Sequence, residues 1–422
     1  MRVLAVTHGR RPGGAQEAML ENLKMLRRRG VDINVLTCHA ADGADRGFLS
    51  DIEKLGIATF VVPQRQTHIG FKYPDLEVEQ HAELIKSSDI VWITDVEYLV
   101  APRIKRIRRD IPVVAYIPSN SLVCPLTFAS YGMRETCTEN CFRSLRRFAR
   151  CKRLSQQYMA QWHLKSTRLK VYQFLNFPKT CVEFVTWPMN RVVVESIDGW
   201  VAISPFTRDF MRSHLQQLGW DRDVPMEVIP NAVMMPEPII AENCQDDGRE
   251  ILYASGSGIW KGPHIVLSAA RQLLNEGSKG FTITMLGVQG DDWIKGLVRR
   301  LQIERHVKLL PWLPRKEVGG LMVRSAVVLL PALTPEPLPR VPIEANLLGT
   351  PAIVSNRGAL PYTIVDRVTG LVTEPSVEAM AKCVDDALRT DWNPEVIART
   401  AKERFDPARL GGDLVCFLES FV

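Results

Sequence analysis

The stretch AVVLLPALTPEPLPRVPIEANLLGTPAIVS, residues 326–355, contains the pattern that decides the fold. Two apolar runs, AVVLLP and PAIVS, flank a proline-rich loop and a segment of helical character that begins near Val341. A strand, a helix and a second strand in this order predict a βαβ unit, in which the two strands are parallel. Glu336 in the loop and Glu344 in the helix can therefore face a ligand at the carboxyl ends of the strands, where open α/β sheets bind ligands.

The same alternation extends to both sides of this stretch. Strands are predicted at ILYAS, FTITMLG and VKLL, and an earlier series runs from RVLAVT to GWVAIS, residues 2–204, before a proline-rich linker at 230–250. We predict an α/β fold with two Rossmann-like, doubly wound parallel-sheet domains, residues 1–235 and 236–392, facing across a cleft. A cysteine-containing insertion is expected near 119–190, and helices at 393–422 are expected to pack back on the first domain.

Two glycine-containing turns lie at strand-to-helix junctions. In RRPGGAQE, Gly13 and Gly14 let backbone N–H groups and a helix N-terminus approach a diphosphate, although a tight turn that needs glycine only for its geometry would look the same. In ASGSGIWKG, Gly256 and Ser257 belong to a second such loop, and Lys261 can reach phosphate oxygens. A solvent-exposed lysine is the alternative interpretation of Lys261.

The two glutamates are suited to hydroxyl groups. Carboxylate oxygens accept hydrogen bonds, and a sugar ring and a ribose both offer hydroxyls in pairs. An acid and a nucleophile in glycoside hydrolysis would instead flank one bond, with one carboxyl in an apolar setting. The positions of Glu336 in a loop and Glu344 in a helix favour ligand binding, with two surface carboxylates as the alternative.

In combination, these segments resemble a known family. The glycine pair, KLLPWLPRKEVGGLMVRSAVVLLPAL, EPLPRVPIEANLLGTPAIVSNRGALP and DRVTGLV, in that order, are similar to the family 4 retaining glycosyltransferases of GT-B fold, glycosyl transferases group 1. The resemblance implies transfer of a hexose-type sugar, with retention, from a nucleoside diphosphate sugar on the second domain to an acceptor on the first. The acceptor could be a polysaccharide, a lipid-linked glycan or a small molecule, and no further cofactor is expected for catalysis.

The resemblance also implies roles for individual residues. Glu336 would hold the donor sugar, Glu344 the ribose and Lys261 the diphosphate, with Glu336 and Lys261 as the catalytic pair. The rest of the expected donor site consists of Gly13, Gly14, Gly256, Ser257, Leu338 and Arg340.

Three departures from the family pattern leave a second function open. GSGIW stands where the family commonly has an arginine before the lysine, which Arg340 or Arg357 would have to replace, and Pro339 stands where a glycine is usual. PSNSLVCP stands where relatives often have His-Asp-aromatic, so Ser119 and Asn120 are the expected polar groups on the acceptor side. The alternative is a catalytically degenerate protein that binds nucleotide sugars or regulates; an epimerase of the same fold is a further rival.

Nine cysteines in a chain without a recognisable secretion signal favour thiols over disulfides. Four of them fall within one 28-residue run of the insertion. They could hold a structural zinc ion or an iron-sulfur cluster, or they could be ordinary reduced thiols. The four are Cys124, Cys137, Cys141 and Cys151.

A basic helical face follows these cysteines. It is either an ordinary solvated face or a surface attracted to an anionic membrane or a lipid diphosphate. No run approaches the ~20 apolar residues of a membrane helix, so we expect a cytoplasmic protein, peripheral at most at the inner face of the membrane. A net charge of +6 does not favour nucleic-acid binding. The face consists of Arg143, Arg146, Arg147, Arg150 and Arg153.

Overall fold

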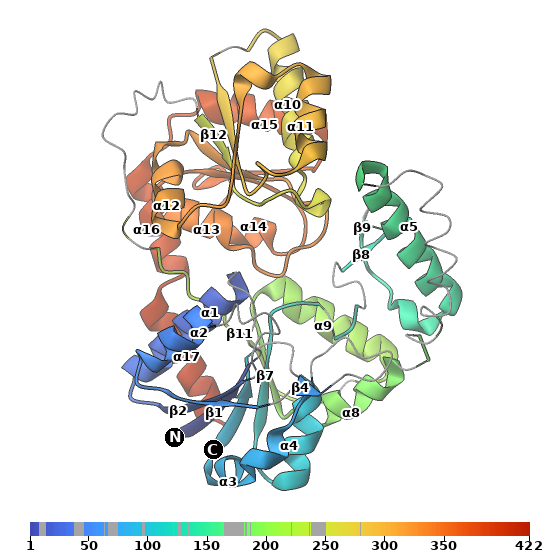
Figure 1. The fold of residues 1–422 in the computed structure, drawn as a ribbon, viewed down its shortest axis with the longest axis vertical. Coiled ribbons are helices and arrows are strands. Elements are labelled where there is room, and N and C mark those ends of the chain that lie inside the picture. The colour runs from blue at the N-terminus through green and yellow to red at the C-terminus, as the bar shows by residue number, and fades with distance from the viewer. Residues whose placement is uncertain are drawn as a thin grey trace.

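The computed structural model contains two α/β domains with a separate helical projection on the first (Figure 1). It describes residues 1–7, 14–37, 46–62, 64–65, 75–94, 98–120, 122–124, 129–132, 135–163, 181, 184–185, 187–220, 222–235, 237, 250–278 and 280–422. Among these residues, no helix is both long and apolar enough to cross a membrane.

The first domain is built on a parallel sheet of seven strands in the order β11-β10-β7-β6-β1-β2-β3. From β1 the chain first adds β2 and β3 on one side. It then crosses to the other side of β1 and adds β6, β7, β10 and β11. The strands are β1 (Arg2–Val6), β2 (Asp32–Thr37), β3 (Ala58–Val61), β6 (Ile90–Ile93), β7 (Val113–Ile117), β10 (Gly199–Ala202) and β11 (Met226–Val228).

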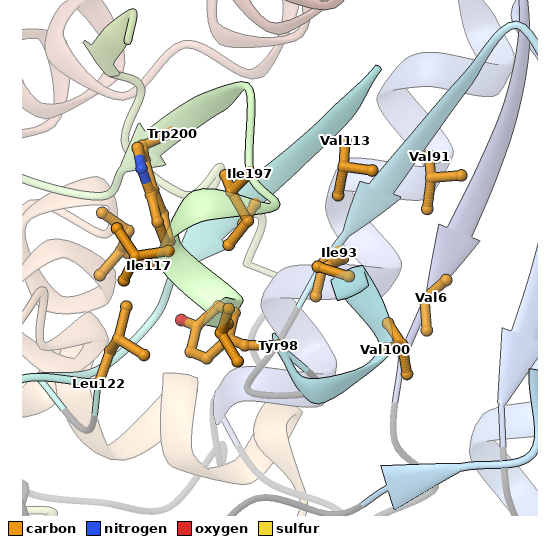
Figure 2. Close-up of a cluster of buried hydrophobic side chains, with 14 of the residues drawn as sticks. Val6, Val91, Ile93, Tyr98, Val100, Val113, Ile117, Leu122, Ile197 and Trp200 are labelled. Carbon is orange, nitrogen blue, oxygen red and sulfur yellow. The ribbon is translucent and has the colours of Figure 1, made fainter. Parts of the chain in front are cut away.

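Helices cover both faces of this sheet because successive strand residues alternate between two buried clusters. The face of Val6, Val91 and Trp200 packs on one group of helices (Figure 2), and the face of Ala5 and Trp92 packs on another. The helices of this domain are α1 (Gly14–Arg28), α2 (Arg46–Glu53), α3 (Ala82–Ser87), α4 (Ala101–Ile107), α8 (Asn190–Glu195) and α9 (Pro205–Leu218).

The second domain repeats the design with a six-stranded parallel sheet in the order β14-β13-β12-β15-β16-β17. Its strands are β12 (Glu250–Tyr253), β13 (Thr282–Leu286), β14 (Val307–Leu310), β15 (Val327–Leu330), β16 (Ala352–Ser355) and β17 (Gly370–Thr373). Its helices are α10 (Pro263–Asn275), α11 (Asp292–Leu301), α12 (Arg315–Arg324), α13 (Arg340–Leu347), α14 (Leu360–Thr363) and α15 (Val377–Arg389).

The chain then returns to the first domain through α16 (Pro394–Arg404) and α17 (Pro407–Glu419), so both termini lie at the same end of the molecule (Figure 1). Helix α17 lies against α1, where a Cβ on Gly411 would be 2.9 Å from the Cβ of Met25. The ring of Phe421 fills the space beside Gly199 in β10. Buried Phe405, Leu414 and Leu418 belong to the apolar cluster of the first sheet.

The insertion projects beside the second domain (Figure 1). It contains a short hairpin, β8 (Ser130–Tyr131) and β9 (Glu135–Thr136), and the long helix α5 (Leu145–His163). Another two-stranded piece, β4 (Gln64–Arg65) and β5 (Asp75–Leu76), lies in the body of the first domain.

The predicted fold class is confirmed, with small shifts at element ends. Strand β10 ends at Ala202, two residues before the end of the run GWVAIS, because Ser204 caps α9 and accepts a hydrogen bond from the N–H of Thr207. Helix α13 begins at Arg340 rather than Val341. The three-residue strand β11 was not predicted because Met226–Val228 is too short for an alternating pattern.

Candidate functional site

The loop that carries Lys261 follows β12 and is fixed by glycines. Gly256 and Gly262 have φ angles of +70° and +77°, a region that L side chains rarely adopt. A Cβ on Gly262 would lie only 2.1 Å from the carbonyl oxygen of Pro331, so glycine is required where the loop closes on the end of β15. Below the loop, the buried Tyr253 hydroxyl donates to the carbonyl oxygen of Gly256 at 2.9 Å.

Lys261 and Glu336 form an ion pair across the carboxyl ends of β12 and β15. The distance from Nζ to Oε1 is 2.9 Å, and the side chains are 26% and 15% exposed. Glu336 is held from behind, because its carbonyl oxygen accepts from the N–H of Ala359 at 2.8 Å and its backbone passes against Gly358, which has a positive φ. The lysine and the carboxylate that the sequence assigned to the site thus meet in space.

Glu344 lies on α13, in a cluster of charges that joins the two domains. Arg315 and Arg340 of the second domain both donate to its Oε1, at 3.1 Å and 3.3 Å. Both arginines also reach carboxylates on α1 of the first domain: Arg340 makes a bidentate contact with Glu21 at 2.8 and 3.1 Å, and Arg315 donates to Glu17.

This cluster is deeply buried at its centre. The side chains of Glu21, Arg340 and Glu344 are 4%, 10% and 13% exposed. Burial alone would lower the pKa of Arg340, but the hydrogen bond to Glu21 and the charges of the three nearby glutamates outweigh it and raise that pKa. The guanidinium therefore stays charged, and one arginine orients both the first domain and Glu344.

A cavity of about 270 Å³ opens beside Glu344. Its walls combine apolar side chains with the charged cluster, an arrangement typical of small-molecule sites. Trp312 is 64% exposed, and its ring packs on Gly287 and Gly256, where a Cβ would lie 2.4 Å and 3.1 Å away. The lining residues are Glu17, Met235, Ala254, Trp312, Leu313, Arg315, Val318, Met322, Arg340, Val341 and Glu344.

Trp312 was not predicted from the sequence, although it lies inside the segment KLLPWLPRKEV that carried the resemblance. The available signal was its position: a large aromatic residue two positions after β14 ends, at the ligand-binding edge of a parallel sheet.

The loop between β15 and α13 also contacts the first domain. The hydroxyls of Ser204 and Thr207, at the start of α9, lie 2.6 Å and 3.3 Å from the carbonyl oxygen of Pro337. Leu338 is only 7% exposed and belongs to the apolar cluster of the first domain. Leu338 thus anchors the loop between the domains, and the proline at 339 precedes α13 as its N-cap.

The acceptor-side candidates follow β7. Ser119 is half-buried, and Asn120 is 1% exposed. Within the described residues, neither polar atom of the Asn120 side chain has a hydrogen-bond partner, an arrangement that is unfavourable for a buried amide. Gly14 is the first residue of α1, whereas Gly13 lies outside the described residues.

The guanidinium of Arg357 contacts Glu374 at 3.2 Å and the side chain of Asn356, and its compensating role toward the donor stays a prediction. Arg340 does lie at the site, but its contacts are with Glu21 and Glu344 rather than with Lys261.

All four cysteines of the insertion lie in the described part of the chain, and no group of three or more His, Cys, Asp or Glu side chains there is placed to hold a metal ion. A zinc ion or iron-sulfur cluster at these cysteines stays a prediction. Burial, and after it the charge of neighbouring cysteines, raises the pKa of Cys137, Cys141 and Cys151. The sulfur of Cys137 lies 3.2 Å from the carbonyl oxygen of Glu139, and that of Cys151 lies 3.7 Å from the carbonyl oxygen of Ser130.

Solved structures share this two-domain architecture over the whole chain. The Anabaena Alr3699/HepE structure in complex with UDP and glucose superposes with a TM-score of 0.64 at 18% identity and covers all of both chains. The apo form of the lipopolysaccharide outer core galactosyltransferase WaaB gives a TM-score of 0.65 at 14% identity over 99% of each chain. The chain has the GT-B fold.

Parts of this GT-B chain also match known sequences. Residues 237–404 match the family model of glycosyl transferases group 1. Glycogen synthase of Mycobacterium tuberculosis is 28% identical over 170 residues, 40% of each chain, and D-inositol 3-phosphate glycosyltransferase of Mycobacterium leprae is 30% identical over 159 residues, 36% of each chain. The chain therefore spans less than half of the length of these curated relatives.

Proposed function

We propose that this protein is a retaining glycosyltransferase that moves a hexose-type sugar from a nucleoside diphosphate sugar to an acceptor bound by the first domain. The observation that carries the proposal is the Lys261–Glu336 pair at 2.9 Å, at the same edge of the second sheet as Glu344 and its cavity. A cation flanked by two carboxylates matches a diphosphate that lies between a sugar and a ribose.

Each part of the donor has a counterpart in the cleft. The cavity beside Glu344 would take the nucleoside, with Trp312 against the base and Glu344 accepting from the ribose hydroxyls. Lys261 and the backbone of the Gly256 loop would face the diphosphate, and Glu336 would turn to the sugar hydroxyls. Occupied structures of Alr3699/HepE, with UDP and with UDP-glucose, support a uridine nucleotide as the first donor to test.

The reaction can be written with all atoms accounted for. The acceptor hydroxyl oxygen forms a bond to the anomeric carbon while the bond from that carbon to the phosphate oxygen breaks, on the same face of the ring. The bonding electron pair leaves with the nucleoside diphosphate, and the acceptor proton passes to the departing phosphate oxygen. Lys261 would stabilise the charge that develops on the diphosphate, and Glu336 would fix the position of the sugar.

The buried amide of Asn120 supports an acceptor role for the loop after β7. It lies at the carboxyl end of a central strand of the first sheet and lacks a hydrogen-bond partner among the described residues. A hydroxyl-rich acceptor or the donor sugar could supply the missing donor and acceptor, with Ser119 beside it.

The proposal is tested by following nucleoside diphosphate release from a panel of UDP- and GDP-linked hexoses, with and without added polysaccharide and lipid acceptors. We expect release from at least one donor, and loss of release in Glu336→Gln and in Lys261→Met. Nuclear magnetic resonance of the product would report whether the anomeric configuration is retained. Donor conversion to an epimer without acceptor would instead indicate the epimerase rival.

A second candidate is a protein that binds the donor without transfer. It is favoured by the absence of the His-Asp pair, replaced by Ser119 and Asn120, and by the engagement of Glu344 with two arginines. This candidate predicts tight nucleotide-sugar binding with no release of nucleoside diphosphate from any donor, under conditions in which the protein is folded and saturated.

A further inference from the structure

The positive charge of this protein is concentrated in the insertion. Between Glu139 and Glu183 the chain contains ten Lys and Arg residues and no Asp or Glu. The remainder of the chain then has 43 basic and 47 acidic residues, a net charge of −4. The net charge of +6 is therefore the sum of a strongly basic segment and a slightly acidic remainder of the chain.

Helix α5 divides this segment into two faces. The inward face is packed: Phe148, Cys151 and Ser155 are 1%, 5% and 1% exposed. Arg147, at the side of the helix, is neutralised by Glu139 at 3.1 Å and lies over the ring of Tyr131. The outward face, taken to include the 3₁₀ turn Cys141–Arg143 just before the helix, is a stripe of exposed arginines spaced three and four residues apart: Arg143, Arg146, Arg150 and Arg153.

The stripe is unfavourable for the isolated helix. Arg146 and Arg150 are like charges four residues apart, and the helix contains no acidic residue that could separate them. Arg146 also lies in the first turn, where the helix dipole favours acidic groups. A sequence that retains such repulsion on an exposed face is expected to relieve it by binding an anionic surface.

Apolar side chains are also exposed within the insertion. Leu145, between two arginines of the stripe, is 39% exposed, and Val185, just beyond the basic segment, is 73% exposed. Basic residues interleaved with exposed apolar side chains suit the interfacial region of a bilayer, where the cations meet lipid phosphates and the apolar groups meet acyl chains.

Helix α5 also lies close to the cleft between the two domains. The hydroxyl of Tyr158 in α5 lies 3.4 Å from Nε2 of His264, three residues after Lys261. The helix therefore borders the cleft, on the side where Figure 1 shows it standing next to the second domain. A surface bound to the outward face of α5 would lie near the entrance to the cleft.

We propose that the outward face of α5, formed by Arg143, Arg146, Arg150 and Leu145, docks on an anionic lipid bilayer. The partner is identified by charge: a dense negative surface with an apolar layer beneath it. This inference is independent of sugar transfer, since it concerns a face that contains none of the donor-site residues.

Sedimentation with vesicles tests the proposal directly. The parent should bind vesicles of phosphatidylcholine with phosphatidylglycerol and not vesicles of phosphatidylcholine alone. Binding should be lost at ~1 M salt, where the Debye length falls to ~3 Å. The triple variant Arg143→Gln/Arg146→Gln/Arg150→Gln should bind on the order of 100-fold more weakly, at about fivefold per charge removed.

A matched control removes the same charge elsewhere. Lys295→Gln/Arg299→Gln/Arg300→Gln alters three exposed basic residues on α11 of the second domain and should bind as the parent does. Equal melting temperatures of parent and variants would show that all are folded. The proposal is overturned if the parent does not bind anionic vesicles or if the α5 variant binds them as tightly as the parent does. It is also overturned if the control variant loses as much vesicle affinity as the α5 variant. Tighter binding of a soluble anionic polysaccharide than of vesicles would assign the stripe to a different partner and would also overturn it.

Discussion

Glu336 and Glu344 have different neighbours, and we infer different roles from them. Glu336 pairs with Lys261 at the end of β15, whereas Glu344 shares one oxygen with two arginines inside the domain interface. The first carboxylate can turn toward a sugar while its lysine turns to phosphate. The second is fixed in direction by its partners, which suits recognition of a rigid ribose.

Substitution of each glutamate should therefore separate nucleoside from sugar recognition. Loss of a charge-assisted hydrogen bond weakens affinity by about 1.5–3 kcal/mol, roughly 10- to 150-fold. We expect Glu344→Gln to weaken the binding of both nucleoside diphosphate and nucleotide sugar by this amount, and Glu336→Gln to weaken only the binding of the nucleotide sugar. Isothermal titration calorimetry of both variants with both ligands measures these affinities. If Glu336→Gln lost equal affinity for both ligands, the assignment would be contradicted.

Trp312 should contribute stacking on the base. Stacking of a base on an aromatic side chain is worth about 1–3 kcal/mol, so Trp312→Ala should raise the nucleoside diphosphate dissociation constant by roughly 5- to 150-fold. Trp312→Phe should retain most of the affinity. Because the side chain is 64% exposed, the urea midpoint should change little in either variant. If Trp312→Ala bound nucleoside diphosphate as tightly as the parent does, the assignment of Trp312 to the site would be contradicted.

His264 should make stability depend on pH in mild acid. Burial lowers its pKa from 6.5 to about 4, so between these values the unfolded chain binds a proton that the folded chain does not. Stability contributed by neutral His264 is thus complete above pH 6.5 and falls as the pH drops toward 4, by about 3 kcal/mol. Urea unfolding between pH 6.5 and 4 should show that the free energy of unfolding falls by this amount more in the parent than in His264→Gln. If the free energy of unfolding depended on pH in the same way in both proteins, the assignment would be refuted.

At the scale of elements, α1 and α13 are joined by charge rather than by apolar packing alone. Glu17 and Glu21 on α1 reach Arg315 at the start of α12 and Arg340 at the start of α13. The same arginines hold Glu344, so the ribose candidate is completed by the first domain. The position of α1 and the direction of the Glu344 carboxylate should therefore change together.

A double-variant cycle on Glu21 and Arg340 tests this link. Breaking a buried pair costs up to about 3–5 kcal/mol; because Arg340 keeps Glu344 and Glu21 keeps Arg315 at 3.6 Å, Glu21→Gln and Arg340→Met should each lose part of this amount. The double variant should lose less stability than the sum of the two single losses, because the Glu21–Arg340 contact is removed only once. Additive losses in urea unfolding would show that the two residues do not act as a pair.

At the scale of the whole molecule, the sequence predicted the elements that repeat. Runs such as ILYAS and PAIVS are buried on both faces, and the glycines at 256 and 262 stand where φ must be positive, so local pattern was sufficient. Lys261 and Glu336 were each expected at the site, but their direct pairing was not predicted, because it depends on β12 and β15 being neighbours in the sheet.

Features that depend on the approach of the two domains could not be predicted. Glu21 and Arg340 are 319 residues apart, and no local pattern relates a helix in one domain to a helix in the other. The resemblance placed Leu338 in the donor site, but it did not indicate that its side chain packs in the apolar cluster of the first domain. The four cysteines lie close in sequence, but their spacing alone does not determine whether they hold a metal ion.

The most direct test of the central proposal is an equilibrium titration of the parent and of Glu344→Gln with UDP, GDP, ADP and dTDP. We predict that at least one of them binds the parent and stabilises it by about 2.7 kcal/mol at 100 times its dissociation constant, and that Glu344→Gln binds the same nucleotide at least tenfold more weakly. If no nucleoside diphosphate binds the folded parent, or if the variant binds as tightly, the cleft between the two domains is not the nucleotide-sugar site proposed here.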